Sequence, residues 1–369
     1  MVTWCRPGLA LVALALSVLM GGCGPKEQTA GNTGAPPSTG SAPSAAPDGT
    51  ARRKKVGVSL SSRNHNFFLG MEQGVVDELK AQGLDYEIAV AEDSANRQQE
   101  QIDQFIRMKV DAIIMVPVDA EQAITPVEAA NKAGIPIFCI DRRVTDPRAR
   151  VTATIETDNV AMGEEAARYA LKLLCQRYKL DSNRPEEVKR LRAKVVHLWG
   201  FETASSAQDR ARGFEKVFNP TTTPNVTVIK AVGDFNAKKA QEVMAPILTA
   251  NPDIDLVFSH GDDNSLGALN AILDIKKQRE APDDPRRILL VGMDGNKPAI
   301  EKIRAGEIEA TVSQEPIQMG RVTVQQVKKV LDGGQPDSTY IPIPHHLITR
   351  KEAEANRGKL WADQLRETR

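Results

Sequence analysis

The chain has 369 residues with 48 Lys plus Arg against 48 Asp plus Glu, so its formal net charge at pH 7 is zero. This balance excludes a typical nucleic-acid-binding protein, which carries a basic surplus that neutralises phosphates. Apolar residues account for 41% of the sequence. That share excludes disorder along the whole chain and supplies enough material for two compact lobes.

The first 23 residues are typical of a bacterial export signal. Arg6 precedes an apolar run from Leu9 to Met20, and small residues then lead to Cys23. The run is shorter than the roughly 20 apolar residues that span a bilayer. Small residues directly before a cysteine resemble a lipobox, so we expect cleavage there and diacylation of Cys23. Ordinary cleavage with a free cysteine and an uncleaved anchor are the alternatives, and export follows from all three.

Residues 24–54 are rich in Gly, Ala, Pro, Ser and Thr and hold few charges. A segment of this composition buries too little apolar surface to offset the entropy lost on ordering. We therefore predict a disordered tether between the export signal (1–23) and a folded body that begins at Lys55.

From Lys55 onward, short apolar strands alternate with amphipathic helices. Val56–Leu60 is predicted as a strand, and Phe67–Leu79 as a helix with one apolar face. The runs Ala112–Val116 and Ile135–Ile140 are almost wholly apolar, which is typical of parallel strands covered on both faces. The other predicted elements of this series are a strand at Tyr86–Ala91 and a helix at Gln98–Met108.

A second series repeats the pattern. Its predicted strands are Lys194–Leu198, Val226–Ile229, Leu256–Phe258 and Ile288–Val291, and its predicted helices are Ala207–Val217, Ala237–Leu248 and Ser265–Ile275. Strand, helix and strand at this spacing predict right-handed crossovers, so the fold class is α/β with two similar doubly wound parallel-sheet lobes. Ligands of open parallel sheets bind outside the carboxyl ends of the strands, so the loops after those ends are the candidate site.

Those loops carry polar and aromatic residues in a definite order. The segments are Ser61–Phe68, Asp141–Arg143, Ser205–Phe214, Gly233–Asn236, His260–Ala268, Val291–Gly295 and Ala310–Pro316. Together these seven segments, within residues 55–349, closely resemble the type I periplasmic sugar-binding proteins, especially the ribose-binding branch of solute receptors for ABC importers.

The resemblance implies two lobes joined by a three-segment hinge and closing over one sugar. The crossings should lie near Thr157–Asn159, Ser313–Glu315 and Pro342–His345. The N-terminal lobe would then comprise residues 55–156 and 315–343, the C-terminal lobe residues 157–314 and 344–355, and a C-terminal tail residues 356–369.

The resemblance also implies which residues bind the ligand. Phe67, Phe68 and Phe235 match the family's stacking positions, Asp141, Arg142, Asp294 and Gln314 match its polar rim, and Ser61 and Arg210 are further candidates. A sugar needs such a combination, because its C–H faces pack on aromatic rings and its hydroxyls bond to charged or amide groups. Several of these residues also have a structural alternative: core packing for the phenylalanines, turn formation for the aspartates and an ion pair with Asp209 for Arg210.

The chain departs from the ribose-binding pattern at four polar positions. His65 and Gly261 stand where asparagines are expected, Val116 replaces a polar residue and Gln208 replaces a sugar-facing arginine. We expect Gly261 to leave room, into which Asp262 supplies alternative hydrogen bonds, and His65 to lie either in the site or in an exposed loop. The ligand is therefore expected to differ from ribose and to be another pentose, a hexose or a polyol.

These features predict an exported receptor that captures a monosaccharide or polyol by lobe closure and delivers it to an ABC permease. It would be a monomeric lipoprotein anchored at Cys23 and facing the periplasm or cell exterior. A chemoreceptor or signal-molecule receptor of the same fold is the alternative.

Other classes lack their signatures. A DNA-binding repressor that shares this body needs an N-terminal helix-turn-helix, where this chain has a signal and a tether. Gly-x-Ser-x-Gly, phosphate-loop and His-Glu-x-x-His motifs do not occur, so we predict no enzyme, although Asp141 and Asp294 could serve as a glycosidase pair. His345 and His346 lack a spaced third ligand, so neither a metal nor a cofactor is expected.

Three side chains outside the ligand-binding set complete the predictions. A disulfide between Cys139 and Cys175 would pin lobes that must move, so both thiols are predicted to be reduced and buried. Trp199 follows a strand and is predicted to pack there, with an extra ligand platform as the alternative.

Overall fold

The computed structural model describes residues 52–278 and 287–366. The predicted export signal, Cys23 and nearly all of the tether lie outside these residues. No helix of the described part of the chain is long and apolar enough to cross a membrane.

The first lobe is built on a six-stranded sheet in the order β11-β5-β4-β3-β1-β2, and every neighbouring pair is parallel. Its strands are β1 (Lys55–Leu60), β2 (Asp85–Val90), β3 (Ala112–Met115), β4 (Ile137–Ile140), β5 (Ala153–Thr157) and β11 (Tyr340–Ile343). Its helices are α1 (Asn66–Ala81), α2 (Ala95–Arg107), α3 (Ile124–Lys132) and α10 (Pro316–Leu331).

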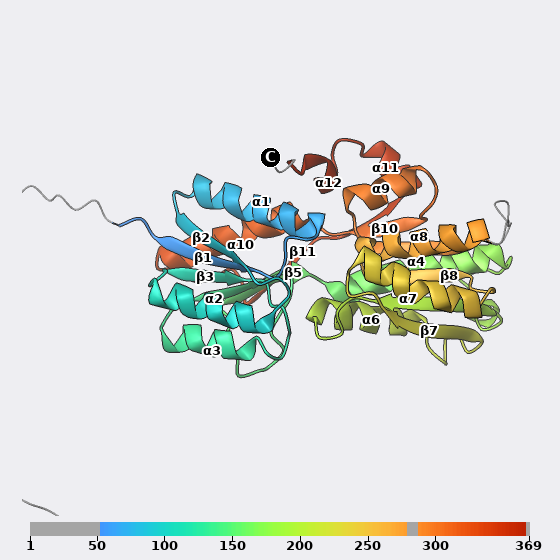
Figure 1. Cartoon of the computed structure of the whole chain (residues 1–369), viewed down its shortest axis with the longest axis horizontal. Helices are drawn as coiled ribbons and strands as arrows, with labels where there is room; N and C mark the ends of the chain where they lie inside the picture. Colours follow the sequence, from blue (N-terminus) through green and yellow to red (C-terminus); the bar gives the residue numbers. More distant parts are fainter. Residues whose placement is uncertain (1–51, 279–286, 367–369) are drawn as a thin grey trace, which may run out of the picture. The chain divides into compact units, whose positions relative to one another are not determined.

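Helices cover both faces of this sheet (Figure 1). Ile114 and Phe138 belong to the apolar core under α1 and α10, whereas Ile113 and Cys139 belong to the core under α2 and α3. Successive strand residues point to opposite faces, so β3 and β4 are buried along their whole length. This explains the unbroken apolar runs that predicted them.

The second lobe repeats the design in the order β12-β10-β9-β8-β6-β7, with β12 antiparallel to β10. Its strands are β6 (Ala193–Trp199), β7 (Val226–Val232), β8 (Leu256–Ser259), β9 (Leu289–Asp294), β10 (Ala310–Ser313) and β12 (His346–Thr349). Its helices are α4 (Asn159–Arg177), α5 (Pro185–Val188), α6 (Ser205–Val217), α7 (Ala237–Ala250), α8 (Asp262–Gln278), α9 (Lys297–Arg304) and α11 (Arg350–Ala355), and α12 (Trp361–Gln364) follows near the C-terminus.

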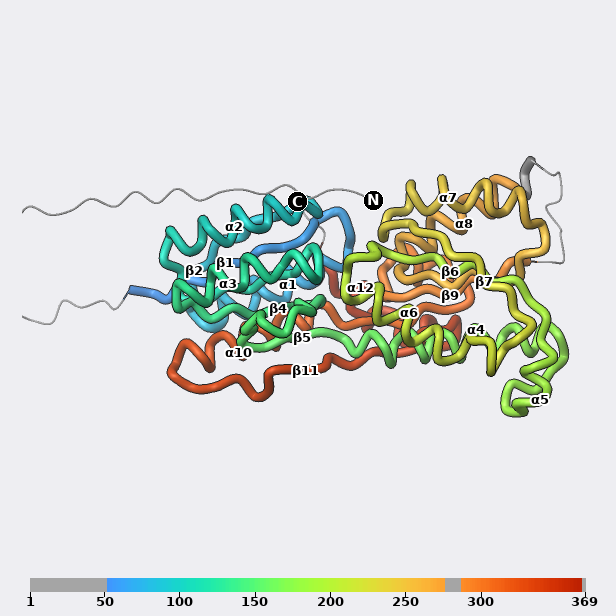
Figure 2. The backbone as a smooth tube through the Cα atoms, turned by 90° about the horizontal axis from the view of Figure 1, so that it is seen from below, coloured from blue at the N-terminus to red at the C-terminus, as the bar shows by residue number. Residues whose placement is uncertain are grey.

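The chain passes between the two sheets at three predicted places. β5 leads into α4, β10 leads into α10, and β11 leads into β12, and Figure 2 traces these connections. The predicted fold class, two similar doubly wound lobes with a three-segment hinge, is therefore confirmed. The predicted state of the cysteines is also confirmed, because Cys139 and Cys175 are free and buried.

Paired glycines bring two helices together in each lobe. A Cβ added at Gly320 of α10 would lie 2.6 Å from the backbone nitrogen of Val75 in α1, and one added at Gly163 of α4 would lie 2.8 Å from the Cα of Arg210 in α6. Since real Cβ atoms do not approach so closely, only glycine allows these helices to pack at this distance. The close packing fixes the positions of α1 and α6, and both helices carry candidate site residues.

Candidate ligand site between the lobes

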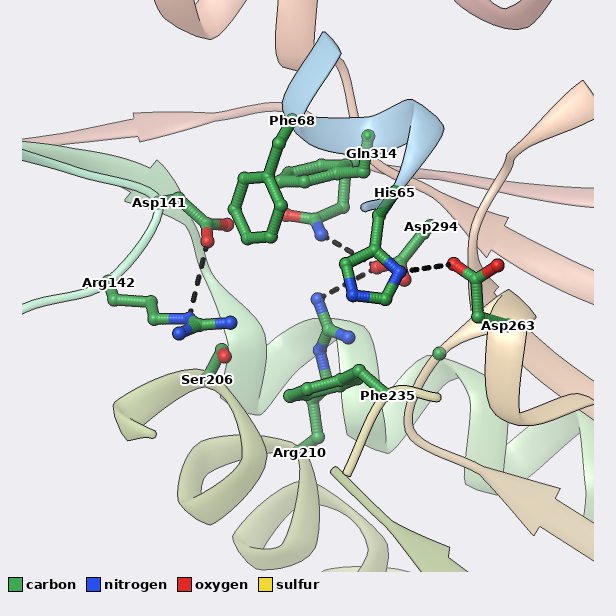
Figure 3. Close-up of a pocket in the computed structure, with 12 residues that line it drawn as sticks. His65, Phe68, Asp141, Arg142, Ser206, Arg210, Phe235, Asp263, Asp294 and Gln314 are labelled. Carbon is green, nitrogen blue, oxygen red and sulfur yellow. Dashed lines mark hydrogen bonds and ion pairs between the residues drawn. The ribbon is translucent and has the colours of Figure 1, made fainter. Parts of the chain in front are cut away.

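Loops from both lobes enclose a cavity at the carboxyl ends of their strands (Figure 3). Its lining comprises His65, Phe67, Phe68, Asp141, Arg142, Ser206, Arg210, Phe235, Gly261, Asp263, Asp294 and Gln314. The empty space, its mouth included, is about 380 Å³. The lining combines aromatic rings with charged and amide groups, which suits a small polar ligand.

Aromatic rings line two sides of the cavity. Phe67 and Phe68 begin α1 and meet edge to face, with ring centroids 5.5 Å apart. Phe235 comes from the second lobe and has a φ of 54°, an uncommon conformation for a residue with a side chain. A Cβ at Gly261 would lie 2.9 Å from the Phe235 ring. The expected room at Gly261 is therefore taken by Phe235, which corrects that prediction.

Asp141 and Arg142 present opposite charges to the cavity with little compensation from the protein. Both side chains are 5% exposed, and their closest approach, Oδ2 to Nε, is 3.5 Å. The Arg142 Nε has no hydrogen-bond partner among the described residues. Its guanidinium also lies 5.6 Å from the Phe68 ring centre and 5.8 Å from that of Phe235. A buried pair with spare bonding capacity is suited to a ligand that both donates and accepts hydrogen bonds.

Asp294 is held more completely by protein groups. Its Oδ1 lies 3.1 Å from Arg210 Nη2 and accepts a 2.8 Å hydrogen bond from Gln314 Nε2. Arg210 in turn donates to Asn159 Oδ1 at 2.9 Å and to the backbone oxygen of His260. Asn159 and Gln314 lie at two of the crossings, so this network joins the cavity to the hinge.

Burial changes the proton affinity of both carboxyl groups. It raises the pKa of Asp141 to about 6, although the positive charges of Arg142 and Arg210 act in the opposite direction. It also raises the pKa of Asp294, against the effect of Arg210 and the hydrogen bond from Gln314. At neutral pH Asp141 is thus predominantly an acceptor, and its protonation changes in mildly acidic solution.

His65 and Asp263 meet across the cleft. Nδ1 of His65, directly before α1, lies 3.1 Å from Oδ2 of Asp263 in α8. The His65 side chain is only 13% exposed. His65 therefore lies in the cavity wall rather than in an exposed loop, and it contacts the opposite lobe.

Nine of the twelve predicted ligand-binding residues line the cavity, and three do not. Gln208 donates to the backbone oxygen of Glu202 instead. Asp262 is fully buried and accepts hydrogen bonds from the backbone nitrogens of Gly295 and Asn296, so it shapes the loop after Asp294. Ser61 is buried without a hydrogen-bond partner for its hydroxyl among the described residues.

Helical geometry accounts for two residues that the sequence prediction missed. Ser206 and Arg210 are four residues apart on α6 and share a face, whereas Gln208 lies halfway between them on another face. Asp263 rather than its neighbour Asp262 points into the cavity, because consecutive helical residues diverge by about 100°. The i, i+4 spacing was the signal that could have found Ser206.

The other predictions concern residues near the site. Trp199 is absent from the lining and packs against His260, with ring centroids 5.1 Å apart, as its packing prediction states. Val116 is fully buried. The described residues contain no group of three His, Cys, Asp or Glu side chains suited to a metal ion.

Comparison with known proteins identifies the family of this chain. The family model described as periplasmic binding protein domain matches residues 56–335. The ribose import binding protein of Bacillus subtilis is 31% identical over 309 residues, which cover 83% of this chain and 92% of that protein. The D-apiose import binding protein of Paraburkholderia graminis is 26% identical, with 86% and 93% covered.

Solved structures of periplasmic binding proteins share the fold of this chain. The arabinose ABC transporter binding protein of Shewanella sp. ANA-3, bound to arabinofuranose, superposes with a TM-score of 0.72 at 25% identity, covering 84% of this chain and 96% of that one. This chain belongs to the type I periplasmic binding proteins, the exported, extracytoplasmic substrate-binding components of ABC importers.

Proposed function

We propose that this protein captures a monosaccharide or polyol in the cavity between its lobes and delivers it to an ABC permease. The observation that carries the proposal is the buried Asp141–Arg142 pair between aromatic rings of opposite lobes. A hydroxyl both donates and accepts hydrogen bonds, so adjacent hydroxyls of a sugar satisfy a carboxylate and a guanidinium together. The phenyl rings cover the C–H faces of the same molecule.

The residues that we propose to bind the ligand all line the cavity. Phe67, Phe68 and Phe235 enclose the ring, and Asp141, Arg142 and Asp294 bond to its hydroxyls, with Arg210, Gln314 and His65 completing the wall. Of the four departures from the ribose-binding pattern, His65 and Gly261 line the cavity, and these two support a ligand other than ribose. Micromolar affinity corresponds to about −8 kcal/mol, which a few charge-assisted hydrogen bonds and stacked rings supply net of closure costs.

Closure is the proposed mechanism. Ligand contacts come from both lobes, so a ligand stabilises the closed arrangement, in which all of them are made. The ligand is bound and released without covalent change. The lobes are those of the sequence prediction, residues 55–156 with 315–343 and residues 157–314 with 344–355, and the receptor acts as a monomer.

A thermal-shift screen tests the ligand class. The mature protein is heated with pentoses, hexoses and polyols, because a ligand that binds only the folded state raises the melting temperature. At least one is expected to do so with micromolar affinity in calorimetry, and to be recovered unchanged. A screen without any stabilising sugar or polyol, or one in which the sugar is converted, contradicts the proposal.

Membrane anchoring is a separate part of the proposal. Residues 1–23 are removed on export and Cys23 is diacylated, so residues 24–54 tether the receptor to a membrane facing the periplasm or cell exterior. Mass spectrometry of the mature N-terminus is expected to find a diacylated cysteine, and Cys23→Ser is expected to move the protein to the soluble fraction. An unmodified N-terminus in the wild type contradicts the anchor.

A further inference from the structure

The residues beyond α11 form a link between the lobes that the sequence prediction treats as a tail. Leu360 packs against the core of the second lobe, and Asp363 lies 3.9 Å from the Arg304 guanidinium of the same lobe. The two residues between them contact the first lobe: Trp361 and Ala362 form an apolar cluster with Ile317 of α10. Figure 1 shows α12 between α1 and α11.

Polar contacts extend this link along α1. The side chain of Gln73 donates to the backbone oxygen of Gln364 at 3.2 Å and accepts from the backbone nitrogen of Arg366 at 2.9 Å. The Arg366 guanidinium lies 2.7 Å from Asp77. These groups are exposed, so their individual contributions are small. Trp361, which is 2% exposed, is the main anchor.

Trp361 contacts one cavity residue from each lobe. Its indole Nε1 donates a 3.1 Å hydrogen bond to the backbone oxygen of Asp294. Its ring meets Phe67 edge to face, with centroids 6.4 Å apart at 89°. The ring also lies over Gly70, where an added Cβ would approach it to 3.2 Å. Trp361 is itself outside the cavity lining.

The contact with Asp294 supports an unusual backbone conformation. Asp294 has a φ of 109°, which costs free energy in a residue with a side chain and persists only where neighbours hold it. The Trp361 N–H and the Asp262 carboxylate, which accepts a hydrogen bond from the backbone nitrogen of Gly295, are such neighbours. The indole therefore helps to aim the Asp294 carboxylate into the cavity.

We propose that Trp361 is a positioning residue of the ligand site, which holds Phe67 and Asp294 in place from outside the cavity and makes residues 360–366 a fourth connection between the lobes. This inference rests on the proposed function for its effect on affinity. Trp361 makes both contacts only when the lobes are arranged as in this structure, so it favours the closed state before ligand arrives. A larger closed population raises the apparent affinity in proportion.

Three variants of the mature protein, with two controls, separate positioning from general stability. Trp361→Phe keeps a ring but removes the N–H, Trp361→Ala removes both, and a chain that ends at Leu360 removes the link. Trp199→Phe is the matched control, because its Nε1 has no hydrogen-bond partner among the described residues and it lies outside the cavity lining. A chain that ends at Arg366 controls for truncation.

Calorimetry with D-ribose, L-arabinose, D-galactose and myo-inositol measures affinity, and small-angle scattering of ligand-free protein measures its radius of gyration. Trp361→Phe is expected to lower the affinity for the tightest-binding of these probes at least threefold, with little change in melting temperature. Trp361→Ala and the chain that ends at Leu360 are expected to lower it at least tenfold and to increase the ligand-free radius. The two controls are expected to behave as wild type.

Wild-type affinity and radius in all Trp361 variants would overturn the inference, as would a lowered melting temperature with neither of the other changes. If wild type binds none of the four probes while the radius of Trp361→Ala increases, the link between the lobes is supported and the proposed ligand class is at fault. If the radius is also unchanged, both proposals fail.

Discussion

Asp141 and Arg142 are adjacent in sequence, buried and opposite in charge, yet they do not satisfy each other. Their closest atoms are 3.5 Å apart and the Arg142 Nε has no hydrogen-bond partner among the described residues, so the pair keeps spare bonding capacity. Asp141 also has a φ of 68°, so a strained backbone aims its carboxylate. A buried pair with unmade hydrogen bonds lowers the stability of a protein that binds no ligand. It is useful in a protein whose ligand supplies those hydrogen bonds.

Replacing Asp141 tests this reading directly. Asp141→Asn keeps the shape of the side chain but removes its charge and one acceptor. Affinity for the best ligand of the screen is expected to fall at least tenfold in calorimetry, a loss of about 1.4 kcal/mol or more. The ligand-free melting temperature should not fall, because a buried charge is removed. Unchanged affinity would take Asp141 out of the site.

The raised pKa of Asp141 predicts how binding depends on pH. Below pH 6 the free carboxyl group is mostly protonated, and hydroxyl donors favour its ionised form. Ligand binding therefore lowers this pKa and releases a proton, so affinity should rise from pH 5 to pH 7 and then level off. Calorimetry in buffers of different ionisation enthalpy detects the proton. Asp141→Asn should lose most of the rise, and an equal rise in that variant would assign it to another group.

Side-chain direction limited the sequence prediction of the site. Residues directly after buried strands or at the start of a helix, such as Asp141 and Phe68, line the cavity, because a strand end fixes where the next residues lie. The resemblance predicts Gln208, which lies outside the cavity, and misses Ser206, because a linear resemblance does not register which face of α6 points inward. The packing of the Phe235 ring against Gly261 depends on a contact between two loops, which no local sequence pattern encodes.

Helix pairs set the positions of these side chains. α4 crosses α6 through Gly163 and Gly213, and α1 crosses α10 through Gly74 and Gly320. α6 carries Arg210, and α1 carries both phenylalanines of the first lobe. The site therefore depends on glycines that never touch the cavity.

Gly163→Ala tests this dependence. The added methyl group meets the backbone of Arg210, so α6 has to move, and overpacking of this kind costs about 1–3 kcal/mol of the free energy of unfolding. Displacement of Arg210 should also weaken ligand binding, measured by calorimetry beside denaturant unfolding. Lys172→Ala, at an exposed position of the same helix, should change neither. Wild-type stability in Gly163→Ala would show that the helices separate without cost.

Periodicity predicts β1 to β4 and β6 to β9, including the edge strands β2 and β7, and misses β5, β10, β11 and β12, which flank the connections between the lobes. β3 and β4 are long apolar runs, but β11 is a short edge strand that contains Pro342 and pairs with β5 nearly two hundred residues earlier. Proline is tolerated there because an edge strand need not donate on its free side. The crossings were placed by family resemblance, and α12 had no signal beyond a single tryptophan.

The molecule as a whole joins two similar lobes around one cavity, and its interactions across the cleft come from widely separated segments. His65 faces Asp263, Arg143 of the first lobe pairs with Asp209 of the second, and Trp361 touches both lobes. Each interaction requires the lobes to be close together. Ligand capture by closure accordingly depends on the whole chain rather than on one lobe.

Scattering tests closure in solution. Addition of the best ligand of the screen is expected to decrease the radius of gyration of the wild-type protein, because ligand contacts from both lobes favour the closed state. Asp141→Asn at the same ligand concentration should show a smaller decrease. An identical radius with and without saturating ligand would argue against closure on binding.

The most direct measurement is a crystal structure of the mature protein with the best ligand of the screen. We expect one sugar or polyol between Phe67 or Phe68 and Phe235, with hydroxyls at hydrogen-bond distance, about 2.6–3.2 Å, from Asp141 and Asp294. A ligand that occupies another part of the surface, or that lies in the cavity without touching either carboxylate, would contradict the account.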